Sequence, residues 1–373
     1  MNTSVLSGGL IAGTSRASTI TVEDGWITGI DLAGGPGGRD VSGLIITPGL
    51  IDLQINGGLG DDFTSDLASI WRVGARLPEH GVTAFLPTII TSPPERIETA
   101  LAELGNQPPG YRGAEPLGLH LEGPLISDQR PGIHDPDLIR APASTPVAGW
   151  TRERGVLLVT LAPEVIGAEE AVKALLDEGV VVSAGHTAAD YDQARDAFGW
   201  GVSLVTHLYN AMEPFEHRAP GLIGATFDSQ DVTACLIVDG IHSHPSAVRV
   251  AWTLLGPHRL ALVTDAMAAT GLGDGTYQIA SSSVLVSDGR PTDPAGRLAG
   301  STLTLDQAVR NLIDFTGCSV EEATAAASTV PARMLGLGDR GRVEVGARAD
   351  LTLFDHTMQV VGTMVGGEMV WQT

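Results

Sequence analysis

Residues 180–207 read VVVSAGHTAADYDQARDAFGWGVSLVTH and contain two short apolar runs separated by one helical stretch. Each run is rich in β-branched residues, and each ends on a histidine, His186 in the first and His207 in the second. A strand, an amphipathic helix and a second strand in this order predict two parallel strands joined by a helical crossover.

The same pattern recurs on both sides of this stretch. We predict eight strands, at residues 50–56, 82–88, 117–122, 156–161, 180–186, 202–207, 232–238 and 259–265. Their nearly continuous apolar character indicates a parallel sheet that is covered on both faces. Eight such units over about 250 residues predict a closed (β/α)₈ barrel of the TIM type.

The two ends of the chain carry a different pattern. Residues 1–47 and 339–373 are rich in glycine and contain short alternating runs, which favour antiparallel strands. Neither end could form a stable sheet alone, so we expect both to pair into one small β-sandwich. The barrel is then expected over residues 48–338, with residues 275–298 as a hairpin insert after the eighth strand.

The charge of the chain limits its partners. The formal net charge is −22, and Lys173 is the only lysine. An acidic chain disfavours nucleic acid, and an anionic small molecule would need dedicated cations in its own site. The N-terminus has no basic leader pattern, and no apolar run approaches the roughly 20 residues of a membrane span. We therefore expect a cytoplasmic protein that binds neither nucleic acid nor membrane.

Polar side chains stand at the ends of the predicted strands. They are Gln54 and Asn56 in the first strand, His120 and Glu122 in the third, His186 in the fifth, His207 in the sixth and Asp265 in the eighth. The carboxyl ends of barrel strands meet on one face, where barrel enzymes build their active sites. The pattern predicts a functional site on that face.

Glu122, His186 and His207 are the predicted metal ligands. Two imidazoles and one carboxylate form a common catalytic set that leaves a position open for water. A lone histidine is usually structural, but three such residues ending three separate strands favour a metal site. We expect one Zn²⁺ per subunit, and Fe²⁺, Co²⁺ and Mn²⁺ accept the same ligands.

The first strand argues for a single metal ion. A lysine-bridged pair of metals needs a lysine at the barrel mouth, whereas Lys173 lies within a predicted helix. The first strand offers Gln54 and Asn56 in place of two histidines. We expect these two amides and His120 to surround the ligands, and the alternative for an amide at this position is a weak metal ligand or an anchor for the water.

Asp265 is the predicted proton carrier. A carboxylate beside an activated water can take its proton and later deliver that proton to a leaving group. The alternative role for an aspartate at this position is to cap the following helix.

Several motifs resemble those of the N-acetylglucosamine-6-phosphate deacetylase family of the amidohydrolase superfamily. They are PGLIDLQINGG, GLHLEGPLI, GIHDPDLIR, SAGHTAADYD, THLYNAMEPFEHRAPGLIGA, IVDGIH, LVTDAMAATG and LAGSTLTLDQAV, and they span residues 47 to about 310. THLYNAM followed by RAPGL is the most specific of them. The resemblance implies that a metal-activated water converts N-acetylglucosamine 6-phosphate to glucosamine 6-phosphate and acetate, in amino-sugar catabolism.

The resemblance also implies a role for individual residues. Glu122, His186 and His207 would bind the metal, Asp265 would act as general base and then acid, and His134 would polarise the acetamide carbonyl. The backbone of Asn210 and Ala211, together with Arg218 and His242, would hold the sugar phosphate. The implied lining of the sugar and acetyl group is Ile133, Asp239, Gly240, Ile241, His242, Leu298, Ala299, Gly300 and Ser301. A homodimer is implied, in which the partner subunit helps to hold the phosphate.

A non-catalytic protein that kept the barrel is the alternative class. Loss of a metal ligand or of Asp265 would be its signature, and all four residues are present. For Arg218 and His242 the alternative is an ordinary position in an exposed loop, although both are cations in an acidic chain and suit a phosphate.

Overall fold

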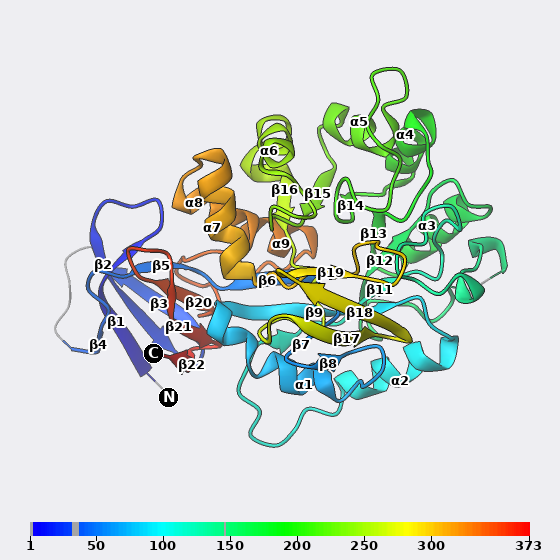
Figure 1. Cartoon of the computed structure of the whole chain (residues 1–373). Helices are drawn as coiled ribbons and strands as arrows, with labels where there is room; N and C mark the ends of the chain where they lie inside the picture. Colours follow the sequence, from blue (N-terminus) through cyan, green and yellow to red (C-terminus); the bar gives the residue numbers. More distant parts are fainter. Residues whose placement is uncertain (1–2, 32–36, 145–146) are drawn as a thin grey trace.

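The centre of the computed structural model is a ring of eight parallel strands (Figure 1). The structure describes residues 3–31, 37–144 and 147–373; residues 1–2 and 32–36 of the predicted N-terminal segment, and residues 145–146, lie outside the described residues. The ring consists of β6 (Leu50–Ile55), β9 (Val82–Ile90), β11 (Leu119–Glu122), β12 (Val156–Leu161), β13 (Val181–Ala184), β14 (Leu204–Val205), β15 (Thr233–Leu236) and β16 (Leu260–Leu262). The predicted α/β barrel class is confirmed.

The barrel closes where β6 meets β16, without a regular ladder. The amide of Asp265 donates to the Gln54 carbonyl at 2.9 Å, and the amide of Asn56 donates to the Ala266 carbonyl at 2.8 Å. Below them, the buried Asp52 carboxylate accepts the Thr264 hydroxyl at 2.6 Å. These few bonds bring the end of the first strand next to Asp265.

Helices cover the outside of the barrel. They are α1 (Ser69–Gly74), α2 (Pro94–Leu104), α3 (Ala168–Asp177), α4 (Tyr191–Trp200), α5 (Gly221–Asp228), α6 (Pro245–Arg259), α7 (Leu305–Thr316), α8 (Val320–Ala326) and α9 (Thr329–Met334). In α4 the side chains of Asp190 and Gln193 form a reciprocal capping box, which satisfies two amides at its start.

A long connection replaces the helix between β11 and β12. Its described residues carry two short 3₁₀ turns, η2 (Pro136–Leu138) and η3 (Pro142–Ser144). Proline removes a backbone donor and disrupts a helix interior, and this connection also contains Pro124 and Pro131. The connection therefore stays irregular, and it carries His134 over the end of the barrel.

Strands from both ends of the chain form one mixed sheet beside the barrel (Figure 1). Its strands are β1 (Thr3–Ile11), β2 (Ala17–Glu23), β3 (Trp26–Asp31), β4 (Arg39–Asp40), β5 (Ile45–Pro48), β20 (Leu351–Phe354), β21 (Val360–Val365) and β22 (Glu368–Gln372). β5 pairs with β20 in antiparallel register, which joins the two ends of the chain. A separate apolar core, including Ile20, Ile46 and Leu351, fills this part.

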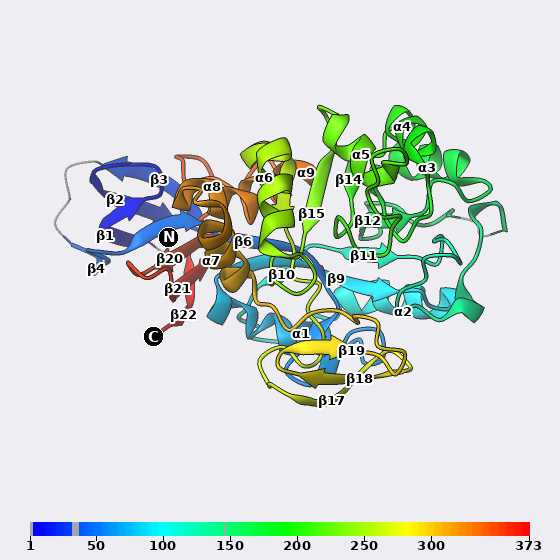
Figure 2. The same ribbon diagram turned by 45° about the horizontal axis from the view of Figure 1, so that its top comes forward.

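The segment after β16 forms a small antiparallel sheet of its own. It contains β17 (Gly275–Ile279), β18 (Ser282–Ser287) and β19 (Arg290–Thr292), one strand more than a hairpin. Figure 2 shows this sheet as a separate layer beside the barrel strands. Ile279, Val284 and Val286 pack with Ile90 and Met267, so the sheet walls one side of the site described below.

No helix in the described part of the chain combines the length and the apolar character that crossing a membrane requires.

Candidate active site

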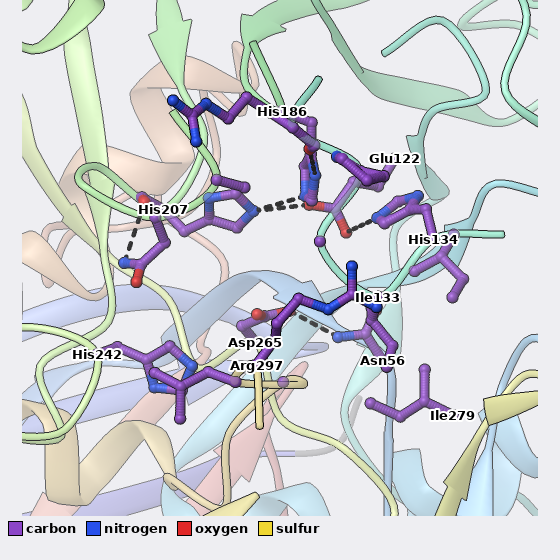
Figure 3. Close-up of a pocket in the computed structure, with 18 of the residues that line it drawn as sticks. Asn56, Glu122, Ile133, His134, His186, His207, His242, Asp265, Ile279 and Arg297 are labelled. Carbon is purple, nitrogen blue, oxygen red and sulfur yellow. Dashed lines mark hydrogen bonds and ion pairs between the residues drawn. The ribbon is translucent and has the colours of Figure 1, made fainter. Parts of the chain in front are cut away.

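Three side chains converge at the carboxyl ends of the barrel strands. Glu122 is the last residue of β11, and His186 and His207 follow β13 and β14 by two residues. One nitrogen or oxygen atom from each residue lies within 4.8 Å of the other two, and all three side chains are buried. Figure 3 shows them directed toward one another. The predicted ligands are confirmed as a buried group that could hold a metal ion; we call it the ligand cluster.

The donor atoms of the ligand cluster suit a cation. Oε1 of Glu122 lies 2.9 Å from Nε2 of His207 and 3.2 Å from Nε2 of His186. Nδ1 of His186 donates to the Arg130 carbonyl at 3.0 Å, which leaves Nε2 as the ring nitrogen that faces the carboxylate. The carboxylate oxygen of Glu122 and a ring nitrogen lone pair repel each other at about 3 Å unless a cation or a proton lies between them. The set therefore fits a divalent metal ion.

The glutamate of the cluster is held in its ionised form. Burial raises the pKa of Glu122, but contacts with His134, His186 and His207 outweigh this and hold the pKa well below its usual range. An anionic carboxylate between imidazoles is the form that binds a cation.

The backbone turns sharply where the strands end. φ is +49° at His186, +30° at His207 and +50° at Asp265, in a region that residues with a β-carbon rarely occupy. Asp265 is fixed there because its carbonyl accepts from the Ser301 amide at 2.8 Å and its own amide donates to Gln54. Clustering of such strained positions is typical of functional sites.

Asp265 lies beside the ligand cluster and is held by two amides. Its Oδ1 accepts from Nδ2 of Asn56 at 2.7 Å and from Nε2 of Gln54 at 3.2 Å. The same nitrogen of Gln54 donates to Oε1 of Glu122 at 2.9 Å. Burial, followed by the charge of Glu122, raises the pKa of Asp265 above its usual range. A buried carboxylate with a raised pKa is suited to exchanging protons near neutral pH.

The two remaining buried histidines of this face have different surroundings. His134 places Nε2 at 3.7 Å from Oε2 of Glu122 and borders the cavity. His120 bonds the Leu53 carbonyl at 3.1 Å and the Thr160 hydroxyl at 2.7 Å, inside the barrel. Burial lowers the pKa of both imidazoles to about 4, so both rings are neutral.

A cavity of about 400 Å³ opens above the ligand cluster. It is large enough for a small ligand. The predicted residues that line it are Asn56, Glu122, Ile133, His134, His186, His207, Asn210, Ala211, His242, Asp265, Leu298 and Gly300. The lining does not include the predicted residues Gln54, His120, Asp239, Gly240, Ile241, Ala299 and Ser301. The structure thus gathers residues from five strand ends and four loops around one space.

Of the two predicted phosphate-binding cations, His242 lines the cavity and Arg218 does not. His242 lines the cavity, and its Nδ1 lies 2.7 Å from Oδ2 of Asp239, whose other oxygen accepts the amides of Ile241 and His242. Arg218 is exposed and borders a different hollow, next to Asp190 and Glu216. The predicted Arg218–His242 clamp is therefore not formed around this cavity within a single chain.

Sequence reasoning did not identify several residues of the site. The cavity is also lined by Arg130, Arg297, Ile90 and Ile279. The hydroxyl of Thr91 contacts Nδ1 of His134. Arg297 directly precedes the predicted Leu298–Ser301 stretch, which was the one signal that pointed to it. The others looked like ordinary strand or loop residues.

The chain matches known families over most of its length. A model described as the amidohydrolase family matches residues 45–370. N-acetylglucosamine-6-phosphate deacetylase of Mus musculus is 43% identical over 350 residues, which cover 90% of this chain and 85% of the mouse protein. The enzyme of the same name from Bacillus subtilis is 39% identical over 335 residues, covering 88% of this chain and 85% of that protein.

Solved structures of N-acetylglucosamine-6-phosphate deacetylases also align with this chain over its whole length or nearly so. The N-acetylglucosamine-6-phosphate deacetylase of Pasteurella multocida aligns with a TM-score of 0.92 and 31% identity, covering all of both chains. An aspartate-to-alanine mutant of the Mycobacterium smegmatis enzyme, in complex with N-acetyl-D-glucosamine-6-phosphate, aligns with a TM-score of 0.91 and 33% identity, covering 99% of this chain and 100% of that one.

Proposed function

Since the chain belongs to the amidohydrolase family, and within it to the N-acetylglucosamine-6-phosphate deacetylases, we propose that its ligand cluster holds the catalytic cation of that reaction. The chain is an enzyme that hydrolyses the acetamide of N-acetylglucosamine 6-phosphate to glucosamine 6-phosphate and acetate. The observation that carries this function is the convergence of Glu122, His186 and His207 at the floor of the cavity.

One Zn²⁺ per subunit is the proposed cation. When bound, such an ion supplies Lewis acidity, which polarises a carbonyl and lowers the pKa of water toward neutrality. The carboxylate and two imidazoles of the cluster are a zinc ligand set. A second metal is not part of the proposal, because Gln54 donates an N–H to Glu122 instead of offering a lone pair there.

Two side chains supply the proton chemistry. His134 would donate its Nε2–H to the acetamide oxygen, which becomes more negative as water attacks the carbonyl carbon. Asp265 would accept a proton from the attacking water and give it to the departing nitrogen as the C–N bond breaks. The amides of Gln54 and Asn56 leave Oδ2 of Asp265 as the oxygen for this transfer.

The phosphate would lie at the other end of the cavity. Asn210, Ala211 and His242 border the cavity. Asp239 lies against Nδ1 of His242, so Nε2 is the ring nitrogen left for a ligand. Arg218 lies outside the cavity of its own chain, on an exposed loop that also exposes Phe215. We propose that in a homodimer Arg218 of the second copy completes the phosphate site.

Acetate release from two substrates tests this assignment. The wild-type enzyme is expected to release acetate from N-acetylglucosamine 6-phosphate with a much lower KM than from N-acetylglucosamine. The substitution Arg218→Ala should raise KM for the phosphorylated substrate by about 30- to 150-fold, since a charge-assisted contact contributes about 2–3 kcal/mol. It should leave hydrolysis of N-acetylglucosamine unchanged.

Arg195→Ala is the matched control, because Arg195 is an exposed arginine on α4. Absence of acetate release from the phosphorylated substrate would refute the proposed function itself. Equal losses by Arg218→Ala on both substrates would show that Arg218 is structural, and full activity of a diluted monomer would refute the shared site.

A further inference from the structure

Thr91 makes a buried contact with His134 that the reaction outlined above does not use. Thr91 follows β9 directly, and both side chains are buried. The Thr91 hydroxyl lies 2.7 Å from Nδ1 of His134. The backbone amide of Thr91 donates to the same nitrogen at 3.3 Å.

This contact decides which nitrogen of His134 carries the proton. A backbone N–H can only donate, so Nδ1 acts as an acceptor and has no proton of its own. A neutral imidazole has one proton, which must then be on Nε2. The Thr91 hydroxyl adds a second donor to Nδ1 and strengthens this preference.

Nε2 of His134 is directed toward the chemistry. It lies 3.7 Å from Oε2 of Glu122, which is longer than a hydrogen bond, and the ring borders the cavity. Its N–H is therefore available to a ligand carbonyl. In the other tautomer, Nε2 would carry a lone pair in place of the proton. This lone pair would repel the acetamide oxygen instead of stabilising it.

The packing around Thr91 is tight and includes the ligand segment. A β-carbon at Gly123 would lie 2.2 Å from the Thr91 hydroxyl and 3.5 Å from Nδ1 of His134. Gly123 follows Glu122 and has a φ of +83°, which favours glycine. The absence of a side chain at this position makes room for the Thr91–His134 contact beside the ligand cluster.

We propose that Thr91 is a positioning residue for the deacetylation, because its hydroxyl and amide hold His134 in the tautomer that offers Nε2–H to the acetamide oxygen. Thr91 itself touches neither the substrate nor the ligand cluster in this role. The inference rests on the proposed function of the cavity, so its first test does not depend on turnover.

The tautomer of His134 can be measured by ¹⁵N NMR of zinc-loaded wild-type protein with labelled histidine. His134→Gln assigns the signals. Nε2 should show the shift of a protonated ring nitrogen, and Nδ1 the shift of an unprotonated nitrogen that accepts hydrogen bonds. In Thr91→Val, the ¹⁵N chemical shift of Nδ1 should move toward that of an unprotonated nitrogen that accepts a weaker hydrogen bond. A protonated Nδ1 in the wild type would overturn the proposal, whether or not the protein deacetylates any sugar.

Kinetics of three variants give the second test. Thr91→Val keeps the shape of the side chain but removes the hydroxyl, and kcat should fall by about 10- to 100-fold, the range for groups that orient a functional imidazole. KM and metal content should stay at wild-type values. Thr91→Ser keeps the hydroxyl and should recover most of the lost kcat.

Thr99→Val serves as the control, because Thr99 lies on the exposed side of α2 and bonds within its own helix. A wild-type kcat in Thr91→Val would overturn the proposal. So would a loss confined to KM, or an equal loss in Thr91→Ser, since either would show that the hydroxyl does not act through His134.

Discussion

Replacing Asp265 with asparagine is expected to lower kcat by about 10³-fold or more, while the protein keeps its metal. General acid–base groups contribute about 10²- to 10⁴-fold to turnover, and Asp265 would serve in both halves of the reaction. Asparagine keeps an oxygen for the hydrogen bonds from Gln54 and Asn56, so the local structure should survive. The measurement is kcat and KM for N-acetylglucosamine 6-phosphate, together with metal content.

Asp314→Asn is the matched control, since Asp314 is exposed on α7. Its kinetics should equal those of the wild type. Nearly normal turnover in Asp265→Asn would show that Asp265 does not transfer the proton. Its role would then be structural, where β6 meets β16.

Removing an imidazole from the ligand cluster is expected to abolish metal binding and activity together. In His207→Ala the cluster retains one carboxylate and one imidazole, which is too few for a stable catalytic site. Loss of the Lewis acid removes several kcal/mol of stabilisation, so turnover should fall by at least about 10³-fold. The metal content of purified protein, measured beside kcat, tests the two losses at once.

The control for this experiment is His356→Ala, a histidine exposed in the terminal sheet region. It should keep both metal and activity. His207→Ala protein that binds a full equivalent of metal, yet lacks activity, would show that His207 acts in catalysis rather than as a ligand.

The sequence was sufficient for the fold and for the three residues of the ligand cluster, because both depend on periodicity. Apolar runs of strand length alternate with helical stretches, and Glu122, His186 and His207 each stand at the end of one run. Barrel topology then brings such ends to a single face. The strand lengths were less predictable: residues 202–207 were expected as a strand, whereas β14 covers Leu204–Val205, since the chain already turns toward His207.

Loop geometry could not be obtained from the same patterns. Arg218 and His242 follow neighbouring strands and were expected to hold the phosphate together in a homodimer. Within one chain, Arg218 borders a different hollow from the one that His242 lines. Arg297 belongs to the segment after β19, and Figure 3 shows it among the residues of the cavity. Its Nε donates to the buried carboxylate of Asp293 at 2.8 Å, which holds the side chain. Such contacts depend on turns whose direction apolar periodicity does not encode.

Thr91 illustrates a different limit. At the end of β9 a threonine is indistinguishable from any β-branched strand residue, and its contact with His134 joins positions that are 43 residues apart. The pairing becomes visible only when the long connection after β11 has been placed over the barrel.

Titration of the metal-free enzyme with Zn²⁺, while acetate release from N-acetylglucosamine 6-phosphate is measured, tests the single catalytic cation most directly. We expect no significant release without metal, a linear rise up to one equivalent per subunit, and no further gain beyond it. Turnover that is undiminished in the metal-free enzyme, or that reaches its plateau only at two equivalents, would contradict a single catalytic cation held by Glu122, His186 and His207.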